Sequence, residues 1–397
     1  MIKNSNITEL LKGVEVEWKT LGEVAELRRG RVISKEDLAK NIGYYPVYSS
    51  QTAKNGEIGK INTFDFDGEF VNWTTDGANA GTVFYRKGKF SITNVSGLIK
   101  LNNSSKLNYK FLFYWLSIET KKHVYSGMGN PKLMSNQVEK IRIPIPPTFV
   151  QTEIVRILDT FTALTAKLTA ELKAELTTRK KQYNYYRDKL LTFKEDEVEW
   201  KTLGEVGQLI RGNGLQKKDF TETGVPAIHY GQIYTYYGTF ATETKSFVSA
   251  ELAKKLKKAK YGDILLAGTS ENVKDVMTPL GWLGGEIVFS GDMYAFRPNN
   301  LVNTKYLTYL LQTTHFQKFK EKYANGTKVI RIQSEKFLTF KIPIPPLKEQ
   351  ARIVEILDTF DALTNSITEG LPREIALRQK QYEYYRNLLL DFPKVQE

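Results

Sequence analysis

The chain has 397 residues, enough for two or three domains with sizeable cores, and 41% of its residues are apolar. It contains no cysteine, which excludes disulfides and thiolate metal sites. No apolar run approaches the ~18 residues that a membrane span needs, and the N-terminal residues lack the apolar core of a signal peptide, so we expect a cytoplasmic protein.

The net charge of +13 divides between two separate parts of the chain. Residues 17–147 contain 19 Lys and Arg against 12 Asp and Glu, and residues 199–346 contain 20 against 13, so each part carries +7. A flexible basic tail would instead concentrate its charges at one end. Two basic bodies indicate a polyanion that is contacted at two places, although the same charge could simply keep a protein soluble.

Several short sequences occur twice, in the same order and with unlike sequence between them. They are VEWKTLGEV (16–24 and 198–206), IPIPP (143–147 and 342–346), ILDTF (157–161 and 356–360), and KKQYNYYRDKLLTF (180–193) with QKQYEYYRNLLLDF (379–392). Each half thus has a start motif, a variable body, a proline-rich motif and a helix. The repeats predict five segments, with boundaries at 1–16, 17–147, 148–198, 199–346 and 347–397.

The first segment, residues 1–16, resembles the tail of a helix like the one that leads into the second body. LLKGVEVEW at 10–18 is similar to LLTFKEDEVEW at 190–200, which leads into the second body. We therefore expect this segment to dock on the helical region, as though the two halves close into a ring.

Both bodies are predicted to be mixed α/β. GEFVNWTT (68–75) and GDILLAGT (262–269) have the composition of strands that end in polar loops. Residues 109–124 and 304–323 are amphipathic helices in matching places. The fold class we expect is α+β, with two globular bodies separated by two long antiparallel helices and related by a pseudo-two-fold internal repeat.

The IPIPP motif should leave each body as an extended segment and start a helix, because proline disfavours helical geometry in the preceding residue. The first helix is predicted from about Thr148 to Phe193, roughly 65–70 Å at 1.5 Å per residue. Its apolar residues form one stripe, which needs a partner in water. We predict that the second copy packs against it as an antiparallel coiled coil. EGLPRE (369–374) interrupts that copy, and Pro372 should break or kink it.

The repeated tyrosines fall into two classes relative to this stripe. Those expected in the core of the coiled coil are Tyr183, Tyr186, Tyr382 and Tyr385. Tyr185 and Tyr384 fall off the stripe, beside Arg187 and Arg386. These four residues are predicted to contact another protein, since exposed aromatic and arginine side chains are typical of interfaces, although single exposed tyrosines are also common.

The proline-rich motif, LKEQARIVEILDTFDALT (347–364) and KQYEYYRNLLLDF (380–392) resemble the specificity subunit of Type I restriction-modification enzymes. The similarity covers essentially the whole chain, in duplicate. It implies that residues 17–147 and 199–346 are target-recognition domains, each of which reads one half of a split site in double-stranded DNA. It also implies that the helices set the unread gap and dock two modification (methyltransferase) subunits, which restriction subunits join.

Two local features bear on this resemblance. The first copy has Val150 where the second has Glu349, a departure that leaves the framework intact. TAELKAEL (169–176) resembles the four-residue repeats whose number tunes the gap in some members of the family. EGLPRE replaces that region in the second half, so the two helices need not be equivalent.

Signatures of catalysis are missing from the sequence. No proline is followed by tyrosine, as an Asn/Asp-Pro-Pro-Tyr methyltransferase motif requires, and there is neither a phosphate-binding Gly-x4-Gly-Lys-Ser/Thr loop nor a Pro-Asp nuclease motif. The only histidines are His123, His229 and His315, too scattered to suggest a metal site. We expect no catalytic residue, metal or cofactor in this chain. The resemblance implies S-adenosylmethionine, ATP and Mg on partner subunits.

Two other functions remain open from the sequence. One is a self-sufficient restriction or methyltransferase enzyme with an unrecognised site. The other is a non-specific nucleic-acid-binding scaffold. Both fit the charge, but neither explains the ordered double repeat.

Three pairs of loops align between the bodies and are candidates for DNA contact. They are 28–31 with 210–213, 46–56 with 226–238, and 127–135 with 326–334. Basic residues shared by both halves suit phosphates, whose geometry is the same at any sequence. These are Arg29 with Arg211, and Lys132 with Arg331.

Residues that differ between the aligned loops are candidates for reading bases. Gln51, Asn55 and Gln232 could pair with adenine, and Lys54 or Lys328 with guanine. Arg28, Arg31 and Asn213 complete the predicted DNA-binding set. Each residue taken alone could equally belong to a solvated turn. Because the bodies differ strongly, the two half-sites should be different sequences.

Overall fold

The computed structural model describes residues 9–127, 129–365 and 369–393. Met128 and residues 1–8, 366–368 and 394–397, which belong to predicted segments, lie outside the described residues. Contacts between Cα atoms divide the chain into two compact units. Unit 1 comprises Met1–Lys167 and Arg378–Glu397, and unit 2 comprises Leu168–Leu377.

In each unit, the start motif pairs with the proline-rich motif. β1 (Glu17–Thr20) runs antiparallel to β8 (Arg142–Ile145), and β9 (Glu199–Thr202) runs antiparallel to β19 (Lys341–Ile344). These ribbons have two strands, so a proline can point its nitrogen away from its partner strand. The extended segment predicted before each helix is confirmed.

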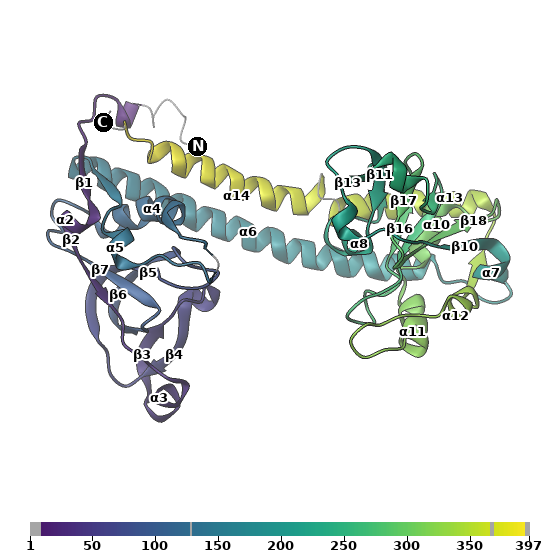
Figure 1. Ribbon diagram of the computed structural model, residues 1–397, viewed down its shortest axis with the longest axis horizontal. Helices are drawn as coiled ribbons and strands as arrows, with labels where there is room; N and C mark the ends of the chain where they lie inside the picture. Colours follow the sequence, from purple (N-terminus) through teal and green to yellow (C-terminus); the bar gives the residue numbers. More distant parts are fainter. Residues whose placement is uncertain (1–8, 128, 366–368, 394–397) are drawn as a thin grey trace. The chain divides into compact units, whose positions relative to one another are not determined.

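Unit 1 contains one six-stranded sheet (Figure 1). In spatial order its strands are β2 (Ala25–Arg29), β7 (Ser96–Leu101), β5 (Phe66–Thr74), β6 (Val83–Ile92), β3 (Ile42–Tyr48) and β4 (Glu57–Ile61). All neighbours are antiparallel except β3 and β6, which are parallel. Trp73 of β5 and Phe111 of α4 (Tyr109–Glu119) are fully buried in the main core.

Unit 2 contains a sheet of the same kind and a second sheet beside it. The first has the order β10 (Gly207–Arg211), β18 (Met293–Pro298), β15 (Ile264–Ala267), β16 (Pro279–Trp282) and β12 (Phe240–Ala241). The second has the order β13 (Ser246–Val248), β11 (Val225–Ile228), β17 (Ile287–Phe289) and β14 (Lys258–Ala259). The strands predicted at 68–75 and 262–269 are β5 and β15.

The helices predicted in the bodies are present but shorter than expected. Residues 109–123 form α4 and the 3-10 helix η2 (Thr120–His123), whereas residues 304–323 divide into α10 (Thr304–Leu310) and α11 (Thr314–Tyr323). The remaining short helices are α2 (Leu21–Val24), α3 (Lys35–Lys40), η1 (Ala53–Gly56), α5 (Ser135–Val138), α7 (Leu203–Val206), η3 (Lys217–Asp219), α8 (Tyr230–Thr235), α9 (Ala250–Ala253) and α12 (Ser334–Leu338).

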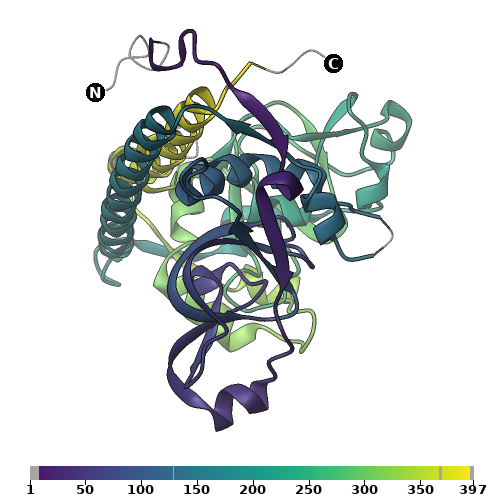
Figure 2. The ribbon, with the colours of Figure 1, turned by 90° about the vertical axis from the view of Figure 1, so that its left-hand side faces the viewer.

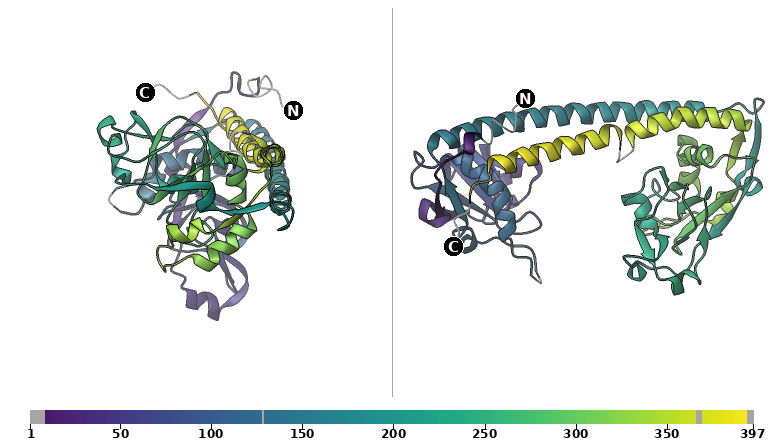
Figure 3. Two further views of the ribbon diagram at one scale, coloured as in Figure 1. Left: turned by 90° about the vertical axis from the view of Figure 1, so that its right-hand side faces the viewer. Right: turned by 90° about the horizontal axis from the view of Figure 1, so that it is seen from above.

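Three long helices follow the proline-rich motifs: α6 (Thr148–Leu190), α13 (Leu347–Thr364) and α14 (Gly370–Leu389). In unit 1, α14 lies beside residues 148–167 of α6, where Thr162 Oγ1 donates to the Tyr382 hydroxyl at 3.1 Å (Figure 2). In unit 2, α13 lies beside residues 168–190 of α6, where the Tyr186 ring stacks on Phe360 at 5.6 Å (Figure 3). Within each unit the paired helices run antiparallel, as the stripe predicts.

The four stripe tyrosines are not equally buried. Tyr183 is only 3% exposed, whereas Tyr186 is 43% exposed despite its stacking. Tyr382 and Tyr385 are half-buried. The prediction of four core tyrosines therefore holds fully only for Tyr183, because a pair of helices covers one side of a ring and a body is needed to cover the other.

The predicted interruption of the second helix is confirmed, but Pro372 is not where it occurs. α13 ends at Thr364 and α14 begins at Gly370, so Pro372 lies in the first turn of α14. A proline is tolerated there because its missing N–H has no partner within the helix. Gly370 has a φ of +69°, and a Cβ there would lie 2.5 Å from the carbonyl oxygen of Ala362, so the break depends on glycine.

Each body also buries the tail of a helix that follows the other body. Leu389, Leu390 and Phe392 belong to the core of unit 1, and the Trp18 Nε1 donates to the carbonyl oxygen of Pro393 at 3.1 Å. In unit 2 the equivalent tail residues Leu190, Leu191 and Phe193 belong to or pack against the core. Leu10, Leu11 and Val14 of the N-terminal segment pack against the core of unit 1.

Candidate nucleic-acid interface

A buried glutamine near the start of each long helix fixes that helix to its body. Gln151 accepts a hydrogen bond from the backbone N–H of Asn108 at 2.8 Å. Its amide nitrogen donates to the carbonyl oxygens of Lys106 and Pro146 at 2.9 and 2.8 Å. In unit 2, Gln350 makes the same bonds with Asn303, Leu301 and Pro345. Both glutamine side chains are fully buried, so each holds its body in one orientation on the helix.

An aspartate of the ILDTF motif makes a second repeated contact. Asp159 accepts hydrogen bonds from Lys110 Nζ at 2.5 Å and from the Tyr114 hydroxyl at 2.7 Å. The equivalent contacts in unit 2 join Asp358 to Lys305 and Tyr309, both at 2.6 Å. Burial raises the pKa of both tyrosines, so each remains a donor. Sequence reasoning missed this role of the glutamine and the aspartate, although their recurrence at the same place in both repeats was a usable signal.

The predicted phosphate anchors of the first body lie together at one end of its sheet. Arg29, the last residue of β2, donates to the carbonyl oxygen of Asn94 at 2.6 Å and lies 4.0 Å from the carboxylate of Asp76. The backbone of Lys132 forms a bridge with Asp76. Lys132 is exposed, and the Arg29 side chain is 36% exposed. The fold thus brings together two cations that lie about a hundred residues apart in the sequence.

The loop that follows β3 belongs to the same end of the sheet. Thr93 Oγ1 donates to Ser49 Oγ at 2.9 Å, next to the Asn94 carbonyl that holds Arg29. On the other side of the loop, Asn79 Nδ2 donates to the carbonyl oxygen of Ser50 at 3.4 Å. These contacts tie residues 49–56 to the loops that surround Arg29.

The predicted base readers of that loop differ in their freedom. Lys54 and Asn55 are exposed, so their side chains are free to contact a base edge. Gln51 is half-buried, and its amide nitrogen donates to the carbonyl oxygen of Glu57 at 2.5 Å. Gln51 therefore helps to close the loop. A role in base contact stays a prediction for all three.

Arg28 and Arg31 lie on the surface of the first body in ion pairs. Arg28 Nε lies 2.8 Å from Glu26, and Arg31 Nε lies 3.0 Å from Asp65. Ion pairs this exposed contribute little stability and exchange readily with other anions. Contact between these arginines and DNA stays a prediction.

The anchors of the second body also converge. Arg211, the last residue of β10, pairs with Tyr294 of β18. Arg331 lies 3.9 Å from the carboxylate of Asp292, two residues before Tyr294. Both arginines are exposed, as is Lys328 in the same loop as Arg331. The pairing of Arg29 with Arg211 and of Lys132 with Arg331 thus corresponds to matching places in the two folds.

Two predicted DNA-binding residues of the second body have their side-chain amides engaged within the chain. Asn213 bonds to the backbone of Lys255 and Lys257, and Gln232 bonds to His229 and Ser246. All four distances lie between 2.7 and 2.9 Å. A DNA contact by either amide would require these bonds to be given up. DNA contact by Asn213 and base reading by Gln232 stay predictions, each with a competing structural role.

The predicted alignment of Pro46 with Pro226 corresponds to matching places in the two folds. β3, which contains Pro46, runs parallel to the end of β6, and β11, which contains Pro226, runs parallel to β17. β6 precedes β7, and β17 precedes β18 in the same way. A role in DNA contact for the loops that follow these two strands stays a prediction.

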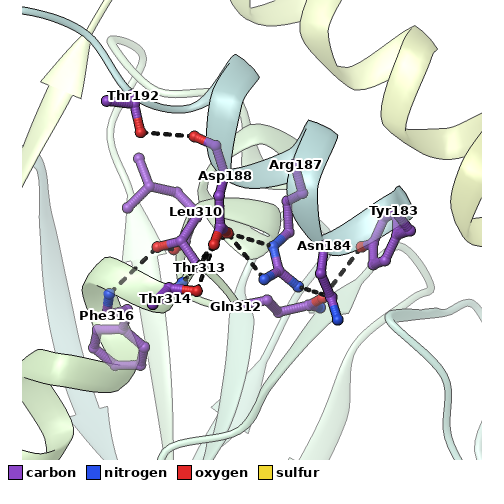
Figure 4. A network of polar contacts seen from close by, with 10 residues as sticks. All are labelled: Tyr183, Asn184, Arg187, Asp188, Thr192, Leu310, Gln312, Thr313, Thr314 and Phe316. Carbon is purple, nitrogen blue, oxygen red and sulfur yellow. Dashed lines mark hydrogen bonds and ion pairs between the residues drawn. The ribbon is translucent and has the colours of Figure 1, made fainter. Parts of the chain in front are cut away.

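In each copy of the repeated Tyr-Tyr-Arg sequence, the first tyrosine is exposed. Tyr185 is 61% exposed and Tyr384 is 55% exposed. The neighbouring Arg187 is only 7% exposed, since its guanidinium bonds to Asp188 at 2.9 Å and Asn184 at 3.0 Å (Figure 4). Arg386 is half-buried and bonds to Asn387 at 3.2 Å. Arg187 therefore does not share the exposed surface of Tyr185, although the sequence grouped them.

Equivalent positions of the two helix tails line a groove in each unit. In unit 2 a groove of about 610 Å³ is lined by Asn184, Tyr185, Asp188 and Phe193, among others. In unit 1 a cavity of about 900 Å³ is lined by Glu383, Asn387 and Phe392 together with Trp18 and Trp115. The tail alone lines the groove in unit 2, whereas the body also contributes in unit 1, where Tyr384 is not among the lining residues.

In the described part of the chain, no group of three or more His, Asp or Glu side chains is placed to hold a metal ion. Among the same residues, no helix is long and apolar enough to cross a membrane.

The fold and the candidate interface define a protein with two unlike basic α/β bodies that are held by one repeated helical frame. A family model described as the Type I restriction modification DNA specificity domain matches residues 13–178 and 195–377. The chain belongs to this family, the family of Type I specificity subunits, as the repeated motifs predicted. The family also agrees with the prediction of a non-catalytic subunit.

Named relatives match along almost the whole chain. The EcoR124I/EcoR124II specificity subunit of Escherichia coli is 37% identical over 99% of this chain and 98% of its own. A specificity subunit of Haemophilus influenzae named as putative is 37% identical over 97% and 98%. A solved chain from work on complex assembly and conformational transition of the type I R-M system has a TM-score of 0.55 and 18% identity, with 94% of both chains covered. The last similarity supports the fold.

Proposed function

We propose that each body reads one half of an asymmetric, bipartite site in double-stranded DNA. The observation that carries this proposal is the repeat of four strands in one order and of two helix contacts in both bodies, around loops that differ. A common frame places phosphate anchors in the same way at both half-sites, whereas unlike loops suit unlike bases. The +7 charge of each body supplies the attraction to the DNA backbone.

The paired helices have a proposed role of their own. They set the number of unread base pairs between the half-sites, and residues 169–176 are where a change in helix length would alter that number. Tyr185 and Tyr384, with the grooves at the helix tails, dock one modification (methyltransferase) subunit each, and restriction subunits join this core. The repeat supports two docking sites of the same kind, since equivalent positions line both grooves.

Catalysis belongs to the partners in this proposal. S-adenosylmethionine, ATP and Mg²⁺ bind to the modification and restriction subunits, and this chain supplies the DNA address. The assembled complex acts in the cytoplasm, where the chromosome is accessible to it.

The test is to express the chain with its modification subunit in a host that lacks adenine methylation and to map the methylated adenines. We expect a motif with two different halves and a fixed gap. A continuous or palindromic motif would contradict the proposal.

Two side experiments separate the alternatives. Methyl transfer from labelled S-adenosylmethionine by the purified chain alone would favour a self-sufficient enzyme. DNA binding that weakens steeply with salt but shows no sequence preference in the assembled complex would favour a non-specific scaffold.

A further inference from the structure

The loop between β3 and β4 contains three consecutive residues with a left-handed backbone. Lys54, Asn55 and Gly56 have φ angles of 48°, 55° and 82°. Residues other than glycine rarely adopt this conformation, and within the described residues Met277 is the only other non-glycine example. Backbone strain of this kind persists where surrounding contacts hold it, and it concentrates at functional sites.

Arg86 of β6 holds this turn from inside the body. Its side chain is 3% exposed, and its Nη2 donates to the carbonyl oxygen of Asn55 at 2.8 Å. Its Nε donates to Asn72 Oδ1 at 2.7 Å, and the guanidinium carbon lies 3.6 Å from the centroid of the Tyr48 ring. One side chain thus joins the strained turn to three different strands of the sheet, β3, β5 and β6.

Stability alone gives little reason for an arginine at this position. Among the described residues Arg86 forms no ion pair, and its Nη1 is buried without a hydrogen-bond partner. Burial lowers the pKa of Arg86 to about 10. A buried charge without a carboxylate is unfavourable, and the aromatic faces of Tyr48 and Phe84 offset only part of that cost.

The turn is built to approach this guanidinium closely. A Cβ at Gly56 would lie 3.1 Å from Arg86 Nη2, tighter than most side-chain contacts. The loop is closed by a hydrogen bond from the Ser49 N–H to the carbonyl oxygen of Gly56 at 2.9 Å. Every polar contact of the turn therefore points inward through its backbone, and the side chains of Lys54 and Asn55 remain exposed.

We propose that Arg86 is a positioning residue for sequence recognition, which holds Lys54 and Asn55 in the backbone conformation that presents them to base edges. This inference rests on the proposed function of the first body as the reader of one half-site. A fixed turn avoids the entropy loss that a mobile loop would suffer on binding, and it allows a lysine or an asparagine to meet one base in one register.

Arg86→Lys is the variant that tests this role. Lysine keeps the positive charge but lacks the planar fork that spans Asn55, Asn72 and the Tyr48 ring together. With the modification subunit, we expect discrimination at one half-site to fall about tenfold, the size of one lost base contact. The other half-site and the gap should match the wild type. Methylation maps of Lys54→Ala and Asn55→Ala identify which half-site the turn reads.

Two further variants make the result decisive. Gly56→Ala distorts the turn without altering the charge of Arg86 and should relax the same half-site, so it decides the matter if Arg86→Lys fails to fold. Ile99→Val is the matched control, because Ile99 is fully buried in the separate core beneath α4. It should lower the melting temperature without relaxing either half-site.

The outcomes separate this inference from the proposed function. Unchanged discrimination in both turn variants, or equal relaxation at both half-sites, would overturn the role of Arg86. A wild-type complex without any bipartite motif would overturn the proposed function instead.

Discussion

The two units share a frame and differ in what the frame carries. Four strands occur in the same antiparallel order, the strands that contain Pro46 and Pro226 join them in parallel, and the same glutamine and aspartate join each body to its helix. Outside this frame, unit 1 has α3, whereas unit 2 has α8, β12 and β14. The shared frame therefore includes the contacts that fix each body to its helix.

The difference indicates how one architecture can serve unlike targets. The additions of each unit follow Arg29 and Arg211, the matching anchors at the ends of β2 and β10. A body can therefore change the loops beyond these anchors without disturbing its attachment to the helix. This separation predicts that frame residues have equal effects in both units and that other residues do not.

The buried glutamines should show the largest effect. Gln151→Ala leaves one buried N–H and two carbonyl groups without partners, and so does Gln350→Ala. We expect a loss of about 3 kcal/mol in the unfolding free energy of the unit concerned. Urea unfolding with hydrogen exchange resolves the two units. The exposed Gln379 gives a control variant, Gln379→Ala, with an expected change within about 0.5 kcal/mol. A large loss of unfolding free energy in one unit and none in the other would show that the two glutamines do not have the same role.

The aspartate contacts should come next. Asp159→Ala and Asp358→Ala each remove bonds to a lysine and a tyrosine. Because these ion pairs are partly exposed, we expect about 1.5 kcal/mol per unit, mostly from the tyrosine bond. The matched variants Asp159→Asn and Asp358→Asn can still accept from the tyrosine and should lose less than half as much. Equal losses for Ala and Asn would show that the lysine contact dominates instead.

The shared frame could be predicted from the sequence because its motifs occur twice. The long helices, the extended IPIPP segments and the matching places of Arg29 and Arg211 all followed from recurrence. The alignment of Pro46 with Pro226 followed from recurrence as well. The extra strands β12 and β14 of unit 2 did not, because they have two residues each and occur once, so local propensity had to identify them without help.

The exposure of single residues could be predicted from the sequence only in part. Position on the helical stripe gave Tyr185 and Tyr384 as exposed, and both are. It could not show that Arg187 is buried, because that burial comes from the turn between α10 and α11, more than a hundred residues away. Tertiary packing, rather than helical periodicity, determines the exposure of Arg187.

Asp188 and Asn387 are equivalent positions where the two units differ, and they should show a smaller effect. Asp188 accepts a hydrogen bond from the backbone N–H of Thr314 at the start of α11 and pairs with Arg187 at 2.9 Å. We expect Asp188→Asn to cost unit 2 about 1 kcal/mol, measured by thermal unfolding, since a carboxylate caps a helix start better than an amide in this partly buried pair. Asn387→Asp, the reverse change in unit 1, should stay within about 0.5 kcal/mol. A similar loss from both changes would remove this difference between the units.

The smallest effect should come from Asp361, whose counterpart in unit 1 is Thr162. Burial raises the pKa of Asp361 above its ordinary value of 3.8, although Thr239 and Asn365 donate hydrogen bonds to it at 2.7 and 2.9 Å. Since the folded state holds this proton more tightly than the unfolded state, unit 2 should lose stability as the pH rises above about 4. Asp361→Asn should stabilise unit 2 at pH 7 by less than about 1 kcal/mol, and the gain should vanish towards pH 4. Urea unfolding at several pH values measures it.

Thr162→Asp is the control that decides whether burial is the cause. Thr162 is exposed, so an aspartate there should keep an ordinary pKa and leave the pH dependence of unit 1 above pH 5 unchanged. Asp361 differs because the hydroxyl of Thr239, itself buried just before β12, lies against it. If Thr162→Asp introduced the same slope, proximity to the paired helix would be responsible. If it does not, the difference between the units at this position comes from the body that covers the helix, and the frame itself is electrostatically the same in both.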